Sequence, residues 1–271
     1  MYLLIDWGNS QLKYVLIEDI FSLANSDVYE LPVQIASSCK ELIDCCEKSL
    51  KGEVMEKVLI ASVRNETDNQ QLTQQISNKT WPYFFAETQS ESCGVKCAYS
   101  FPSKLGIDRW LCILAAYTEG SRRAIIDIGT AIKLDIVDER GVHLGGQIIP
   151  GKRLFEEGLS STGKIEFERS LKTKESFNLG SSTDECVSFG IEQLIASYLS
   201  SIINLSSELY RVDSFVLTGG GAKYWLKRIE NGNLYIDKHS KENKLLISYN
   251  SSLVFKGLTK LYIDKQLKTK K

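Results

Sequence analysis

Two short turns in this chain combine a carboxylate, a glycine, and hydroxyl or amide side chains directly after an apolar run. They are Asp6-Trp7-Gly8-Asn9-Ser10 and Asp127-Ile128-Gly129-Thr130-Ala131. A glycine two residues after the aspartate lets the backbone approach a ligand closely, because no Cβ stands in the way. The neighbouring side chains and backbone amides can donate hydrogen bonds to phosphate oxygens. Either turn alone also fits a plain tight hairpin, but the repetition favours phosphate binding.

A third glycine cluster also comes directly after an apolar run. Thr218-Gly219-Gly220-Gly221 comes after the apolar segment 215–217 and before a helix that we expect to begin near Ala222. Bare backbone at a helix N-terminus can accept a flat nucleoside or a phosphate group. Three such turns, each after an expected strand, predict a nucleotide site between two lobes.

A separate carboxylate could carry proton chemistry. Asp108 stands beside Arg109 in Gly106-Ile107-Asp108-Arg109-Trp110, near the start of an expected helix. An aspartate there can simply cap the helix, with the arginine as a surface cation. The functional alternative is a base that accepts a proton from a hydroxyl attacking a γ-phosphoryl group, with Arg109 binding a carboxylate on the acceptor. His143, in the glycine-rich segment 143–151, is expected to be a structural hydrogen-bonding residue.

The length and an internal repeat predict two lobes. The chain has 271 residues, and the two acidic turns lie 121 residues apart, an offset that also aligns Val15 with Ile136. We therefore predict an α/β protein made of duplicated lobes, residues 1–120 and 121–271, each a mixed sheet flanked by helices.

Hydrophobic periodicity gives the elements that must position these turns. Strands are expected at 2–5, 12–17, 58–63, 81–86, 124–126, 134–137, 142–149 and 215–217. Helices are expected at 35–50, 68–76, 108–117, 183–203, from 222, and at 251–267.

Composition narrows the class of protein. The formal net charge is −1 and the sequence pI is near 6.2, which gives no reason to expect a nucleic acid or an anionic membrane as partner. The N-terminus lacks the pattern of a secretory signal, and no apolar run approaches the roughly 20 residues of a membrane span. The seven cysteines form no C-x-x-C pair and are read as reduced thiols. We expect a cytoplasmic protein.

Taken together, these segments resemble the type III pantothenate kinases of the sugar kinase, actin and heat-shock ATPase superfamily. The resemblance runs from Ile5 to Leu258 and includes Tyr99 with Pro102, and segment 253–258. Its most specific parts are Gly-x-Asp-Arg-Trp at 106–110 and Gly-Gly-x-Ile-x-Pro-Gly at 145–151. The fold that it implies is a pair of actin-like, ribonuclease H-like lobes.

The resemblance also implies an activity and a set of roles. The activity is ATP-dependent phosphorylation of pantothenate to 4'-phosphopantothenate, the first step of coenzyme A synthesis, with Asp108 as general base. The implied ATP-binding residues are Asp6, Trp7, Gly8, Asn9, Ser10, Gln11, Leu12, Lys13, Thr130, Gly219 and Gly220. The implied pantothenate-binding residues are Tyr99, Gly106, Ile107, Asp108, Arg109, Thr162 and Thr183.

Ions and a partner are implied in the same way. Asp6 would meet magnesium through ATP, and Asp127 would hold a monovalent cation, potassium or ammonium. A homodimer would complete the acceptor site across its interface. Glu166 departs from the family, which usually carries proline there. Two other readings stay open: another small-molecule kinase or phosphatase of the superfamily, and a regulatory relative without catalysis.

Overall fold

The computed structural model describes residues 1–25, 30–161, 163, 167, 177–236, 239–240 and 243–269. Contacts group the chain into two compact units. The first comprises residues 1–120, 137–145 and 250–271, and the second comprises 121–136 and 146–249. The division of the chain into two lobes, residues 1–120 and 121–271, stays a prediction.

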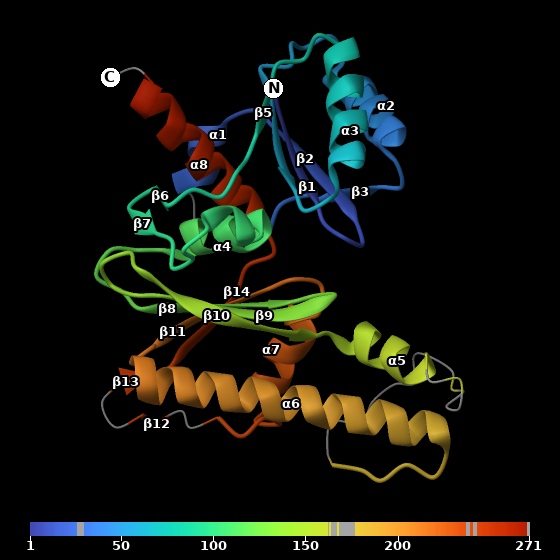
Figure 1. The fold of residues 1–271 in the computed structure, drawn as a ribbon, viewed down its shortest axis with the longest axis vertical. Coiled ribbons are helices and arrows are strands. Elements are labelled where there is room, and N and C mark those ends of the chain that lie inside the picture. Colours follow the sequence, from blue (N-terminus) through green and yellow to red (C-terminus); the bar gives the residue numbers. More distant parts are fainter. Residues whose placement is uncertain are drawn as a thin grey trace. The chain divides into compact units, whose positions relative to one another are not determined.

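The first unit is built on a five-stranded mixed sheet with strand order β3-β2-β1-β4-β5 (Figure 1). Strand β2 runs antiparallel to both of its neighbours, β1 and β3, whereas β4 and β5 run parallel to β1. The strands are β1 (Tyr2–Trp7), β2 (Leu12–Ile17), β3 (Gln34–Ala36), β4 (Lys57–Ser62) and β5 (Tyr83–Phe85).

Helices cover both faces of this sheet. Leu3, Ile5, Val58 and Ile60 form one core with the buried residues of α2 and α3. Leu4 and Leu59, on the alternate face, are also buried, and α8 contacts both β1 and β4. The helices are α1 (Ile20–Asn25), α2 (Cys39–Leu50), α3 (Glu66–Asn78), α4 (Ile107–Ala116) and α8 (Leu253–Thr269), with a short 3₁₀ turn at Pro102–Lys104 and a hairpin of β6 (Glu91–Ser92) and β7 (Val95–Lys96).

The second sheet repeats the first, with strand order β10-β9-β8-β11-β14. Three consecutive strands are again followed by two strands parallel to the first of them, each reached through helix. The strands are β8 (Arg123–Ile128), β9 (Ala131–Val137), β10 (His143–Pro150), β11 (Ser214–Thr218) and β14 (Leu246–Tyr249). The predicted duplication of a mixed, helix-flanked sheet is therefore confirmed at the level of topology.

Two helices bury one face of the second sheet. Residues of α6 and α7 share a core with β8, β9 and β11, and this core includes Phe215, Leu199 and Trp225. The remaining elements are α5 (Lys152–Ser160), α6 (Thr183–Tyr210), α7 (Ala222–Glu230), β12 (His239–Ser240) and β13 (Asn243–Lys244). By length and composition alone α6 could cross a membrane, but Ile191, Ile195 and Ile203 place it in the core of the unit.

Some element predictions need correction. Residues 35–50 do not form one helix. Ile35 lies in β3, where it pairs with Lys13 of β2, and α2 starts after Ser38, whose side chain caps the helix. The apolar residues of the strand happened to continue the helical spacing. Helix α6 runs to Tyr210 rather than residue 203, and α1 was not predicted. The seven cysteines are free thiols, and burial raises the pKa of Cys46 to about 12.

Candidate active site

The first acidic turn joins β1 to β2. Asp6 pairs with Lys13 across the two strands, and the Gly8 amide donates a hydrogen bond to the Gln11 carbonyl at 3.0 Å. Leu12 is buried, whereas Asn9, Ser10 and Gln11 are exposed at the tip. The turn therefore presents backbone and small polar side chains to solvent, as a phosphate-binding turn requires.

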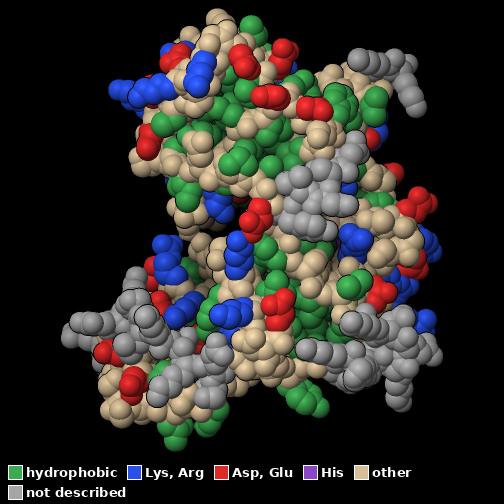
Figure 2. Space-filling view, turned by 180° about the vertical axis from the view of Figure 1, so that it is seen from behind, with side chains coloured by type: hydrophobic (Ala, Val, Ile, Leu, Met, Phe, Trp, Pro, Cys, Tyr) green, Lys and Arg blue, Asp and Glu red, His purple; other side chains and the backbone are tan. Residues whose placement is uncertain are grey.

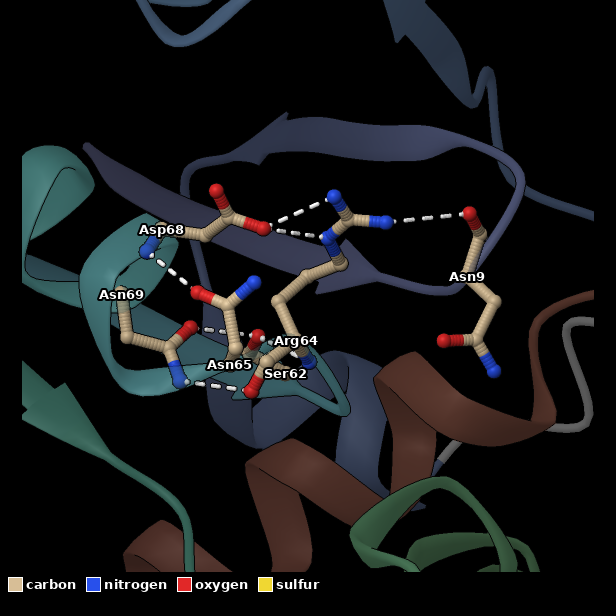
Figure 3. A network of polar contacts seen from close by, with 6 residues as sticks. All are labelled: Asn9, Ser62, Arg64, Asn65, Asp68 and Asn69. Carbon is tan, nitrogen blue, oxygen red and sulfur yellow. Dashed lines mark hydrogen bonds and ion pairs between the residues drawn. The ribbon is translucent and has the colours of Figure 1, made fainter.

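Arg64 braces this turn from the loop after β4 (Figure 3). Its Nη1 donates a hydrogen bond to the Asn9 carbonyl at 3.2 Å, and its Nε and Nη2 both reach Asp68 Oδ2, at 2.8 and 2.7 Å. The guanidinium carbon lies 5.7 Å from the centre of the Trp7 ring. Asn65 and Asn69 hold the loop itself in place. The sequence offered no sign of this contact, because Arg64 is 55 residues from Asn9.

Asp108 occupies the first turn of α4. Gly106 is the N-cap and makes no side-chain capping bond, while Asp108 Oδ1 accepts a hydrogen bond from the Arg109 amide at 2.9 Å. A Cβ at Gly106 would lie 2.6 Å from that oxygen, so the glycine leaves room for the carboxylate. Asp108 is half-buried. A position in the first turn of a helix suits a carboxylate that caps the helix, and the proton-accepting role stays a prediction.

Arg109 and Tyr99 form a paired group beside Asp108. Arg109 is buried, and its Nη1 donates a hydrogen bond to the Tyr99 hydroxyl at 3.0 Å. The Tyr99 ring stacks on His143, with centroids 6.3 Å apart, and His143 Nδ1 accepts a bond from the Ala98 amide at 3.4 Å. His143 thus positions the segment that carries Tyr99, as its predicted structural role implies. A buried guanidinium of this kind is suited to a carboxylate ligand.

The second acidic turn is packed by glycines. A Cβ at Gly219, whose φ is +90°, would lie 2.4 Å from Asp127 Oδ1, and a Cβ at Gly151 would lie 2.3 Å from the Gly129 carbonyl. The Gly221 amide donates to the Ile128 carbonyl at 2.9 Å, and the Gly151 amide donates to Thr130. The predicted third glycine cluster therefore meets the second turn, and α7 begins at Ala222 as expected.

The carboxylate of Asp127 already has a cation beside it. Lys133, on β9, places its Nζ 2.8 Å from Asp127 Oδ2. Only 20% of the Lys133 side chain and 23% of the Asp127 side chain are exposed. Sequence reasoning did not select Lys133, although a lysine six residues after the aspartate of a strand–turn–strand unit was a visible signal.

Other predicted site residues fall in several places. Thr183 is exposed as the first residue of α6, after the N-cap Ser182, and Gly220 is exposed next to Gly219. Thr162 and Glu166 lie outside the described residues. Among the described side chains, no group of three or more His, Cys, Asp or Glu gathers into a metal-binding cluster.

The sequence of this chain is similar to proteins of one known family. A family model described as type III pantothenate kinase matches residues 2–205. The chain belongs to the type III pantothenate kinase family. A type III pantothenate kinase of Acinetobacter baumannii (strain ACICU) is 31% identical over 231 residues, which cover 83% of this chain and 88% of the relative. The type III pantothenate kinase of Cellvibrio japonicus (strain Ueda107) is 33% identical over 234 residues, 82% of this chain and 87% of the relative.

A solved structure extends the fold comparison to almost the whole chain. A Campylobacter jejuni protein described as a Baf family transcriptional activator aligns with a TM-score of 0.55 and 19% identity, covering 98% of this chain and 99% of that one. At this identity the likeness concerns the fold alone. The family match and the repeated sheet order together give the actin-like, duplicated α/β fold.

Proposed function

We propose that this chain phosphorylates pantothenate with ATP, giving 4'-phosphopantothenate and ADP, the first step of coenzyme A synthesis. The observation that carries the proposal is the buried Arg109, bonded to Tyr99 and adjacent in sequence to Asp108. Pantothenate offers a carboxylate and a primary hydroxyl, and this group offers a guanidinium for the first and a base for the second. Family membership supports the same substrate.

The chemical step transfers one proton and one phosphoryl group. Asp108 accepts the proton of the primary hydroxyl as the hydroxyl oxygen forms a bond to the γ-phosphorus. The bond between the γ-phosphorus and the β–γ bridging oxygen breaks, and ADP leaves with that electron pair. Phosphoryl transfer asks the protein mainly for positioning and charge neutralisation. The residues of the first turn, Asp6 to Lys13, and Thr130, Gly219 and Gly220 provide the nucleotide site.

Magnesium fits the donor set at the first turn. Asp6 supplies a hard carboxylate oxygen at the end of β1, and Mg²⁺ commonly takes one or two protein carboxylates and completes its shell with phosphate oxygens and water. When bound with ATP, the ion would neutralise charge on the phosphates. The predicted activation by a free potassium or ammonium ion forms no part of this proposal, because Lys133 already places a positive charge at Asp127.

We also propose a homodimer that completes the acceptor site. Helix α6 leaves Leu194, Leu205 and Leu209 exposed, at spacings that put them on one face of the helix. Exposed apolar stripes of this kind typically mark protein interfaces. Thr183, the proposed substrate contact, begins the same helix. The molecular mass in solution tests this, and a monomer at assay concentration would contradict it.

Two other readings have less support. Another small-molecule kinase of the superfamily would need a different acceptor group in place of Tyr99 and Arg109. A regulatory protein that binds nucleic acid is not favoured by a net charge of −1, or by the face in Figure 2, where acidic and basic side chains are interspersed. We infer that the enzyme acts in the cytoplasm, because ATP and pantothenate are available there.

A coupled assay of ADP release tests the proposal. Wild-type protein is given MgATP with pantothenate, with pantothenate amides that lack the carboxylate, or with hexoses. Release of ADP with pantothenate but much less with the amides is expected, because Arg109 needs the carboxylate. Faster release with a hexose than with pantothenate would assign the chain to a different kinase activity.

A further inference from the structure

The ion pair between Lys133 and Asp127 bears on how the second turn is neutralised. The distance from Nζ to Oδ2 is 2.8 Å, and about four-fifths of each side chain is shielded from solvent. In such a position the ammonium keeps its Coulomb attraction to the carboxylate better than an exposed pair would, because less water screens it. The pair is therefore a fixed part of the turn.

The local packing leaves little freedom at this carboxylate. Gly219 approaches Asp127 Oδ1 so closely that a Cβ would lie 2.4 Å away, and Ile128, the next residue, accepts a bond from the Gly221 amide. Lys133 lies on β9, the strand that leaves the turn. One oxygen of Asp127 thus faces the glycine cluster and the other faces the ammonium.

The charge supplied by Lys133 is the charge that a monovalent cation would supply. Ammonium is one of the two ions that the family resemblance assigns to Asp127, and the lysine side chain ends in the same type of group. A tethered ammonium stays at the site without a binding equilibrium. A second cation at the same carboxylate would meet repulsion from Nζ, which is stronger in a half-buried site than in water. The donor set consequently does not fit a free monovalent cation.

We propose that Lys133 is a built-in cation, so that nucleotide binding and phosphoryl transfer by this chain do not depend on potassium or ammonium. The inference rests on the proposed function for its activity readout only. Lys133 acts on the nucleotide through the second turn and is a positioning residue: it holds Asp127, and hence the turn with Thr130, in one arrangement.

The activity test compares cations at constant ionic strength. Wild-type kcat is measured in potassium, ammonium, sodium and tetramethylammonium chloride, and is expected to vary by less than about twofold. Lys133→Met removes the charge but keeps an unbranched chain, and is expected to lose about tenfold or more in tetramethylammonium, the scale of one lost electrostatic contact. Potassium or ammonium should then restore a large part of the loss. Lys133→Arg, which keeps the charge, should keep the potassium-to-tetramethylammonium ratio near one.

A binding readout separates this inference from the proposed function. The Kd of MgATP is measured by calorimetry without any acceptor, with and without potassium, for wild type and for Lys133→Met. Potassium should leave the Kd of MgATP unchanged for the wild type and lower it for Lys133→Met. If the wild type phosphorylates no pantothenate in any of the salts, the proposed function is wrong. The Kd values for MgATP would still show whether Lys133 replaces the cation.

Two results would overturn the inference. One is activation of the wild type by potassium of about tenfold or more over tetramethylammonium, the effect expected only when the cation must come from solution. The other is a Lys133→Met variant whose Kd and kcat match the wild type in tetramethylammonium. Thermal melting of each variant shows whether a loss reflects unfolding, and in that case Lys133→Arg and the wild-type cation series still give the answer.

Discussion

The Arg109 guanidinium donates a hydrogen bond to the Tyr99 hydroxyl at 3.0 Å, and it does so from a buried position directly after Asp108. The guanidinium carbon also lies 5.8 Å from the centre of the Tyr99 ring. The hydroxyl and the ring of Tyr99 therefore both contact the guanidinium. This pairing brings Tyr99 together with the segment 106–110, and in the proposed function these residues bind the acceptor.

Substitutions of Arg109 and Tyr99 should change the KM for pantothenate and leave the KM for ATP unchanged. Arg109→Lys keeps the charge but loses the planar fork, and the KM for pantothenate is expected to rise about tenfold or more. Tyr99→Phe removes one hydrogen bond and should raise that KM by roughly two- to tenfold. Steady-state kinetics with each substrate varied in turn measures both effects. Tyr83→Phe, at an exposed tyrosine of β5, is the control. An increase confined to the KM for ATP would contradict the assignment.

Asp108 is expected to be the base. Asp108→Asn keeps the size of the side chain but cannot accept the proton, so kcat should fall by roughly 10²–10⁴-fold. Glu66→Gln removes a carboxylate from the first turn of another helix, α3, and controls for the loss of helix-end charge. Turnover near the wild-type value in Asp108→Asn would leave the aspartate as a helix cap only.

Arg64 is expected to matter for ATP. Arg64→Ala removes the bond to the Asn9 carbonyl and the contact with Trp7, so the first turn loses its brace. The KM for ATP should rise by roughly three- to tenfold, the scale of one ordinary hydrogen bond, while the KM for pantothenate changes little. Arg64→Lys should recover part of the loss.

The control for Arg64 is another ion pair of the same unit. Lys79 contacts Glu47 at 2.6 Å, but both side chains are more exposed than those of Arg64 and Asp68. Lys79→Ala should leave both KM values unchanged. Equal kinetics for Arg64→Ala and wild type would show that the turn keeps its shape without the brace.

Gly257 sets how closely α8 packs on α4. A Cβ there would lie 2.0 Å from the Leu111 carbonyl oxygen, which belongs to backbone and cannot move aside. Gly257→Ala should therefore destabilise the fold by about 1–3 kcal/mol, the usual cost of overpacking. Gly190 lies in α6 with nothing near its Cβ position, so Gly190→Ala should be neutral or stabilise by up to about 1 kcal/mol. Denaturant titration compares the two, and equal stabilities would show that the helices separate easily.

The sequence predicted the parts of this site that local pattern controls. Alternating apolar residues and the glycines at 8, 129 and 219–221 were enough to place three turns after strands. The repeat offset was enough to expect two similar sheets, and the two strand orders match. The roles of the predicted site residues stay predictions until the variants are measured.

What escaped prediction depends on contacts between distant segments. Arg64 and Asn9 meet because β1 and β4 are neighbours in the sheet, which no local periodicity reveals. The register of β3 on β2 decided that Ile35 is in a strand, although its spacing also suited a helix. The close approach of α8 to Leu111 joins residues 146 positions apart.

Direct detection of the product is the measurement that tests the central claim. Wild-type protein and Asp108→Asn are incubated with MgATP and pantothenate, and the products are identified by mass spectrometry and ³¹P NMR. We predict 4'-phosphopantothenate in amounts equal to ADP for the wild type, and roughly 10²-fold less or lower for the variant. ADP without phosphopantothenate, or no turnover of pantothenate by a folded wild-type protein, would contradict it.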